Sequence, residues 1–222
     1  LCNPHNPGGR VWDRGVLEKI GHLCQKHGVL LVSDEIHQDL ALFGHRHTSF
    51  NTVDPSFKDF SLILTSATKT FNIAGTKNSY VVIENPKLRT AFKQRQLANN
   101  QHEISGLGYI ATEAAYRYGK SWLTELKQVF EKHIDYVIDE LHEKTHIRVM
   151  KPQGTYLLWL DFSAYPYTDD ELHAKIHDQA KLILNRGTDF GKEGTLHARL
   201  NVAAPFTLIE EITKRLVDTF HK

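Results

Sequence analysis

The chain has 222 residues, of which 41% are hydrophobic and 24% are charged, a globular composition that excludes extensive disorder. Its 27 Lys and Arg residues balance 26 Asp and Glu residues, and this formal net charge of +1 argues against a nucleic-acid partner. No uncharged apolar run approaches the roughly 18 residues of a membrane span. Cys2 and Cys24 are too few for a disulfide framework or a zinc site. We therefore expect a soluble cytoplasmic protein without a metal or a membrane partner.

The first part of the chain alternates helical periodicity with short apolar runs. Asp13 is a suitable cap for a helix with apolar residues at three- and four-residue spacing that ends near Gly28. Three unbroken apolar runs follow, typical of strands buried on both faces of a sheet. They are residues 29–32, 61–64 and 80–83. This order predicts an α/β fold with a mainly parallel sheet and a ligand site at the carboxyl ends of its strands.

The character of the sequence changes after Pro86 to long helical segments. The clearest has an apolar stripe from Leu123 to Leu141 and predicts a connecting helix. We expect residues 1–118 to form an incomplete large domain. Residues 119–222 are expected to form a smaller α+β domain that begins with the connecting helix.

The smaller predicted domain contains two further apolar runs, residues 156–160 and 196–202, which predict strands. A Thr followed three residues later by Glu, the pattern of a capping box, occurs at Thr168 and at Thr207. We expect one helix to begin at each of these threonines.

Three motifs lie at the start of the chain or directly after a predicted strand, where a ligand site is expected. They are Asn3-Pro4-His5-Asn6-Pro7-Gly8-Gly9, Ser33-Asp34-Glu35-Ile36-His37, and Ser66-Ala67-Thr68-Lys69-Thr70-Phe71-Asn72. Together they resemble the fold-type I pyridoxal-phosphate enzymes of the aspartate aminotransferase superfamily, in particular the bacterial cystathionine β-lyases and cystalysins described as MalY/PatB-like. The segments 152–156 and 190–201 agree with this resemblance, which covers the whole chain.

The resemblance implies pyridoxal 5′-phosphate as the cofactor and suggests which residues bind it. Lys69 would form an imine with the cofactor aldehyde, and Asp34 would pair with the protonated pyridine nitrogen. Asn6 would donate a hydrogen bond to the phenolate oxygen of the ring, and Ser66 would bind the phosphate. Taken alone, Lys69 is compatible with a surface lysine, Asp34 with a helix or turn cap, and Asn6 and Ser66 with ordinary turn residues.

Four further residues have expected roles at the edge of the cofactor or on the substrate. His37 occupies the position where many aminotransferases have a tyrosine near the phenolate oxygen. Lys77 occupies the position where many members of the superfamily have an arginine that binds the phosphate. Arg199 would bind the substrate carboxylate as a bidentate fork, although an arginine within a strand also suits a buried ion pair. Gly154 would let the backbone approach the same carboxylate.

The resemblance implies a carbon–sulfur β-lyase that converts cystathionine or cysteine into a thiol, pyruvate and ammonia. An amino-acid aminotransferase would use the same residues, and a truncated, non-catalytic binding or regulatory module is the alternative of a different class. Because the sequence opens inside the Asn-Pro-His-Asn-Pro motif, we expect a C-terminal fragment with weak cofactor retention and little activity of its own. The family is typically homodimeric, so a homodimer is also expected.

Overall fold

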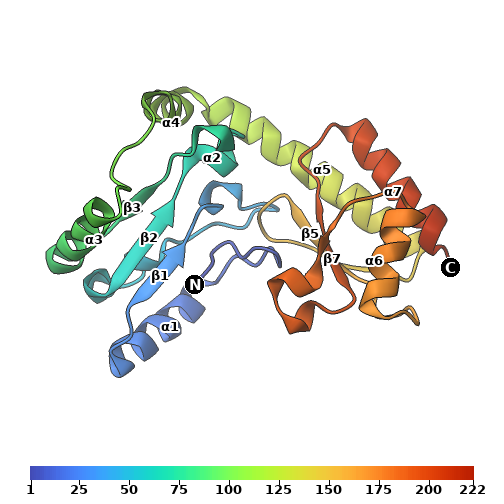
Figure 1. Cartoon of the computed structure of the whole chain (residues 1–222), viewed down its shortest axis with the longest axis horizontal. Coiled ribbons are helices and arrows are strands. Elements are labelled where there is room, and N and C mark those ends of the chain that lie inside the picture. Colours follow the sequence, from blue (N-terminus) through green and yellow to red (C-terminus); the bar gives the residue numbers. More distant parts are fainter. The chain divides into compact units, whose positions relative to one another are not determined.

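The computed structural model describes all 222 residues, which form two compact units (Figure 1). Unit 1 contains residues 1–5 and 10–125, and unit 2 contains residues 6–9 and 126–222. Helix α5 (Lys120–Lys144) begins in unit 1 and continues into unit 2. The expected domain boundary between residues 118 and 119 lies just before this helix and stays a prediction. Every helix is either too short or too polar to span a bilayer.

Unit 1 is built on a three-stranded sheet in the order β1-β2-β3 (Figure 1). Strand β1 (Leu31–Asp34) runs parallel to β2 (Ser61–Thr65), and β2 pairs antiparallel with β3 (Tyr80–Val82). Residues 1–3 run along the other edge of β1 through a parallel bridge between Cys2 and Asp34. The predicted α/β fold with a mainly parallel sheet is therefore confirmed.

One feature of the predicted strands is wrong. The apolar runs suggested burial on both faces, but Val32 is 46% exposed and Val82 is 40% exposed. Successive side chains of a strand point to opposite faces, and only the face that carries Leu31 and Ile63 packs against the core of this chain. The first strand also begins later than predicted, because Val29 and Leu30 remain exposed after the end of the preceding helix.

Helix α1 (Arg14–His27) covers the buried face of the sheet and ends, as predicted, at Gly28, whose φ is 63°. Asp13 occupies the N-cap position, but its carboxylate pairs with the Arg10 guanidinium at 2.9 Å and makes no capping hydrogen bond. Apolar side chains from the helix, the strands and the loop between β1 and β2 form the core of unit 1: Leu17, Leu31, Phe50, Val53, Phe57 and Ile63.

Gly21 lies where the phenyl ring of Phe57 contacts α1, and a Cβ atom at this position would lie 2.1 Å from the ring. Alanine at residue 21 is expected to lower the free energy of unfolding by about 1–3 kcal/mol, because the ring would have to shift in a packed core. Gly15 of the same helix has open space around it, so Gly15→Ala is the control and should be neutral or slightly stabilising. Urea unfolding of both variants measures the difference. A gain in stability from Gly21→Ala would contradict the packing.

The remaining helices of unit 1 follow the second and third strands. They are α2 (Ala67–Thr70), α3 (Pro86–Ala98) and α4 (Gly106–Tyr118). Helix α4 exposes several large apolar side chains, among them Leu107, which is 77% exposed, and Ile110, which is 64% exposed.

Unit 2 is an antiparallel sheet in the order β4-β5-β7-β6 with three helices. Its strands are β4 (Arg148–Met150), β5 (Leu157–Asp161), β6 (Asn185–Arg186) and β7 (His197–Asn201). Its helices are the later part of α5, α6 (Asp169–Asp178) and α7 (Phe206–Phe220). The predicted connecting helix and the strands β5 and β7 are confirmed.

The two predicted capping boxes have different outcomes. Thr168 caps α6, and Glu171 completes the box by accepting from the Thr168 N–H at 2.8 Å. The box at Thr207 is wrong, because α7 begins one residue earlier, directly after Pro205. The fixed φ of proline suits a position next to a helix start, and Thr207 therefore lies inside the first turn.

Candidate active site

The carboxyl ends of β1 and β2 place Asp34 and Lys69 at the same edge of the sheet in unit 1. Asp34 is the last residue of β1, and its Oδ1 accepts from the Ile36 N–H at 3.1 Å while Oδ2 has no hydrogen-bond partner. Lys69 lies in α2, which begins two residues after β2, and its amine makes no hydrogen bond or ion pair. Both side chains are thus available to a ligand.

Ser66, His37 and Lys77 also belong to unit 1, in different surroundings. Ser66 is 1% exposed, caps α2 by accepting from the Thr68 N–H at 3.0 Å, and donates to the Asn78 carbonyl. The Ser66 hydroxyl also lies 2.8 Å from Thr68 Oγ1, so a phosphate would compete with acceptors inside the protein for its proton. His37 is buried just after β1, whereas Lys77 is exposed with a φ of 50°. Phosphate binding by Ser66 and Lys77 and the role of His37 stay predictions.

A small polar cluster next to Lys69 was not anticipated from the sequence. The Asp39 carboxylate accepts from the Thr70 hydroxyl at 2.9 Å and from the Tyr116 hydroxyl at 3.4 Å. Burial, with Tyr80 and Asp39 nearby, raises the pKa of Tyr116 far above its ordinary value, so this phenol stays protonated. The cluster connects α2 to α4 within unit 1.

In unit 2, Arg199 contacts Asn6, although the two lie 193 positions apart in the sequence. Its Nη1 donates to Asn6 Oδ1 at 2.9 Å, its Nη2 donates to Asn185 Oδ1 at 2.8 Å, and its guanidinium carbon lies 4.8 Å from the centre of the Phe190 ring. Burial lowers the pKa of Arg199, but an arginine remains charged in proteins. Two of its nitrogen atoms therefore donate to neutral amides, while the negative charge of Asp189 acts on the guanidinium without a direct hydrogen bond. A guanidinium held in this way is suited to bind a carboxylate.

Gly154 lies against the N-terminal motif in the same unit. The N–H groups of Gln153 and Gly154 donate to the Gly9 carbonyl at 2.8 and 3.1 Å. Gly9 has a φ of 68°, and a Cβ atom there would lie 2.4 Å from Pro152 Cβ, so this close approach requires glycine. The contact of Gly154 with a substrate carboxylate stays a prediction.

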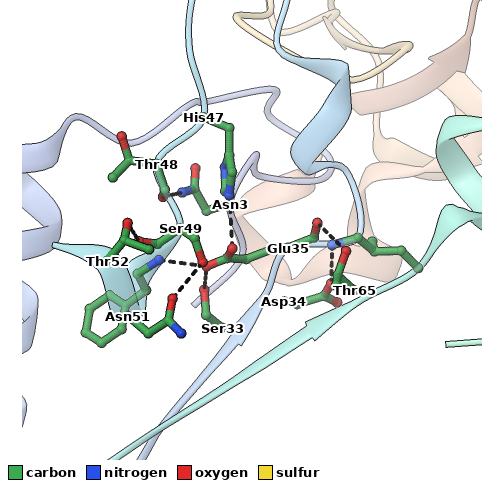
Figure 2. Close-up of polar contacts among 12 residues, drawn as sticks. Asn3, Ser33, Asp34, Glu35, His47, Thr48, Ser49, Asn51, Thr52 and Thr65 are labelled. Atoms are coloured by element: carbon green, nitrogen blue, oxygen red, sulfur yellow. Dashed lines mark hydrogen bonds and ion pairs between the residues drawn. The ribbon is translucent and has the colours of Figure 1, made fainter. Parts of the chain in front are cut away.

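A second unanticipated feature is the buried carboxylate of Glu35, which Figure 2 shows at the centre of a polar cluster. Its Oε1 accepts from the Ser33 hydroxyl and the Phe50 N–H, both at 2.9 Å, and its Oε2 lies 3.0 Å from His47 Nε2. The sequence contained one signal for it. Strand alternation places Glu35 on the same face as the buried Ser33 and opposite to Asp34.

Burial alone would raise the pKa of Glu35, but hydrogen bonds from His47, the Phe50 N–H and Ser49 outweigh it and leave the pKa below its ordinary value. Glu35 is therefore ionised at neutral pH.

No group of three His, Cys, Asp or Glu side chains in the structure is arranged to hold a metal ion.

Comparison with known protein families gives a match to the family described as aminotransferase class I and II, over residues 1–216. The curated relatives include the cystathionine β-lyase PatB of Bacillus subtilis, 41% identical over 97% of this chain and 56% of its own length. They also include the protein MalY of Escherichia coli, 33% identical over 98% of this chain and 56% of its own length. The chain thus spans little more than half the length of these relatives.

Similar solved structures have closely related folds. Cystalysin from Treponema denticola, described as containing pyridoxal 5′-phosphate, has a TM-score of 0.95 at 35% identity, over 98% of this chain and 56% of its own. A pyridoxal-phosphate-bound protein from Clostridium difficile, described as a putative aminotransferase, has a TM-score of 0.96 at 38% identity, over 99% of this chain and 57% of its own. The resemblance of the sequence motifs is confirmed by these matches.

Proposed function

Because this chain belongs to the class I and II aminotransferase family, we propose that its protein is a pyridoxal 5′-phosphate-dependent carbon–sulfur β-lyase. The proposed reaction consumes water and cleaves cystathionine into homocysteine, pyruvate and ammonia. Cysteine would be cleaved in the same way. The observation that carries the proposal is the unpartnered amine of Lys69 together with the half-free carboxylate of Asp34 at the carboxyl ends of adjacent parallel strands. A ligand site is expected at such an edge.

The donor set of the chain fits pyridoxal phosphate. Lys69 is a primary amine that can bond covalently to an aldehyde, and Asp34 Oδ2 can accept a hydrogen bond from a protonated ring nitrogen. The chemistry that the cofactor supplies when bound is an aldehyde for amines and a cationic ring that accepts electrons from the substrate α-carbon. Ser66 fits less well, because its hydroxyl already bonds within the protein.

The residues of the chain would then divide the work between binding and proton transfer. Arg199, oriented by Asn6 and Asn185, would bind the α-carboxylate of the amino acid as a fork. Once released from the aldehyde, the Lys69 amine would remove the proton from the substrate α-carbon. Asp34 would keep a proton on the ring nitrogen.

The experiment that tests this proposal follows the products made by the protein purified from its own cells, whose length is first measured by mass spectrometry. Cystathionine is expected to give pyruvate, ammonia and a free thiol in equal amounts. An aminotransferase would release a keto acid without a thiol, and a non-catalytic module would release nothing. Either result would overturn the lyase proposal.

We also propose that the protein is a homodimer located in the cytoplasm. The exposed apolar face of α4, with Leu107 and Ile110, supports self-association, because large exposed apolar patches mark interaction surfaces. Light scattering is expected to give twice the chain mass, and a monomeric mass would contradict the dimer.

Cell fractionation tests the proposed cytoplasmic location. The division into parts at residues 118 and 119 remains a proposal too, which limited proteolysis tests.

A further inference from the structure

Glu35 is a fully buried carboxylate that the proposed chemistry does not use, although it is the direct neighbour of Asp34. It receives hydrogen bonds from its own strand, through the Ser33 hydroxyl, and from the loop between β1 and β2, through the Phe50 N–H. Figure 2 shows His47 reaching the other carboxylate oxygen from the same loop. One side chain therefore ties the end of β1 to residues 47–50.

The loop is tied in turn to the segment that borders Asp34 on the other side. Asn3 Nδ2 donates to the Thr48 carbonyl at 3.1 Å, and the backbone N–H of Asn3 donates to the Asp34 carbonyl at 2.9 Å. Thr65 at the end of β2 donates to the Glu35 carbonyl at 3.3 Å. Residues 34 and 35 are thus held by residues 1–3 on one side, by β2 on the other, and by the loop between β1 and β2.

We propose that Glu35, supported by His47, is a positioning residue that fixes the end of β1 and thereby holds the Asp34 carboxylate on the opposite face of the strand, ready for a cationic ring nitrogen. The inference rests on the proposed function. Side chains alternate along a strand, so a carboxylate anchored inward at residue 35 directs residue 34 outward.

Glutamine at residue 35 has the right size but the wrong hydrogen-bonding groups. Its amide NH₂ would face His47 Nε2, and the ring would then have to carry its proton on Nδ1. His47 Nδ1 is buried without a hydrogen-bond partner, so this exchange would create an unsatisfied buried donor. We call the contacts of the Glu35 carboxylate with Ser33, His47 and the Phe50 N–H the clamp. Glu35→Gln is therefore expected to weaken this clamp without removing bulk from the core.

The clamp also has an expected pH dependence. Because the pKa of folded Glu35 lies below its ordinary value, its contribution is complete above that ordinary value and is lost as the pH falls through the lower, folded pKa. His47 is the titratable group that faces this carboxylate from the loop. Glu84 contacts the loop through Asn51 and pairs with Lys58.

Amide hydrogen exchange of the 222-residue chain tests the inference directly. At pH 7, Glu35→Gln is expected to accelerate exchange about tenfold or more at Asn3, Asp34 and Phe50, with no change in unit 2. Ser33→Ala, which removes one donor, should do the same to a smaller extent. The matched control is Glu18→Gln on the exposed face of α1, which should have no effect.

The pH profile distinguishes positioning from general destabilisation. In the native sequence, the protection factors of the same amides should decrease when the pH is lowered below about 4.5, the ordinary pKa of a glutamate. In Glu35→Gln they should not change with pH in this range. Unchanged exchange at these amides, or an equal acceleration throughout the chain, would overturn the inference.

Titration with pyridoxal phosphate separates this inference from the proposed cofactor. If the native sequence binds it, Glu35→Gln should bind at least about tenfold more weakly, with a less protonated ring in the ¹⁵N spectrum of labelled cofactor. Equal affinity and equal ring protonation in Glu35→Gln and the native sequence would overturn the role of Glu35 without affecting the proposed cofactor. If the native sequence does not bind, cofactor binding by this chain fails, and the exchange experiment alone decides whether Glu35 fixes Asp34.

Discussion

Replacing Lys69 with arginine is expected to remove covalent capture of pyridoxal phosphate and to lower the lyase rate by at least about 10²–10⁴-fold. A guanidinium keeps its charge at any working pH, so it can neither bond to the aldehyde nor accept the α-proton. The half-buried side chain of Lys69, whose amine has no protein partner, is the group that we propose for both steps.

The measurement combines borohydride reduction, peptide mapping and pyruvate formation in the protein produced at its natural length. Lys87→Arg on the exposed surface of α3 is the matched control and should keep both the modified peptide and the rate. A Lys69→Arg protein that still forms a reduced adduct elsewhere and turns over at the native rate would rule out Lys69 as the reacting lysine. Loss of activity in both variants would indicate misfolding instead.

Replacing Phe57 with alanine is expected to lower the free energy of unfolding by about 3–5 kcal/mol. The ring is fully buried, stacks on Phe50 with centroids 5.1 Å apart, and lies against Gly21 of α1. Removing the Phe57 ring would leave a cavity between α1 and the loop that carries Phe50. The backbone N–H of Phe50 also donates to Glu35. The variant should therefore weaken both the core of unit 1 and the clamp on β1.

Urea unfolding monitored in unit 1 measures this loss. Phe60→Ala is a suitable comparison, because Phe60 packs against the same cluster but is only partly buried and should cost less. Equal losses from the two variants would contradict the central place of Phe57 in the core.

Local sequence patterns predicted the elements that depend on local interactions. The helix ending at Gly28 and the capping box at Thr168 depend on groups within a few residues of one another, and both lie where they were expected. The pattern failed at Thr207, because the preceding Pro205 offered a helix start that the capping pattern alone does not consider. It failed also for Val32, because an apolar residue does not tell which face of a sheet receives a covering layer.

The sequence by itself determined the family, because its motifs place particular residue types directly after particular strands. The roles proposed for Lys69, Asp34 and Arg199 were predicted from residue type and motif alone. Only the tertiary structure decided what those groups contact, since contacts such as that between Asn6 and Arg199 join residues far apart in the chain. It also showed that the hydroxyl of Ser66 already serves a helix cap and that Glu35 is buried. Hydrogen-bond partners and burial depend on how distant segments pack, and residue type or spacing does not encode them locally.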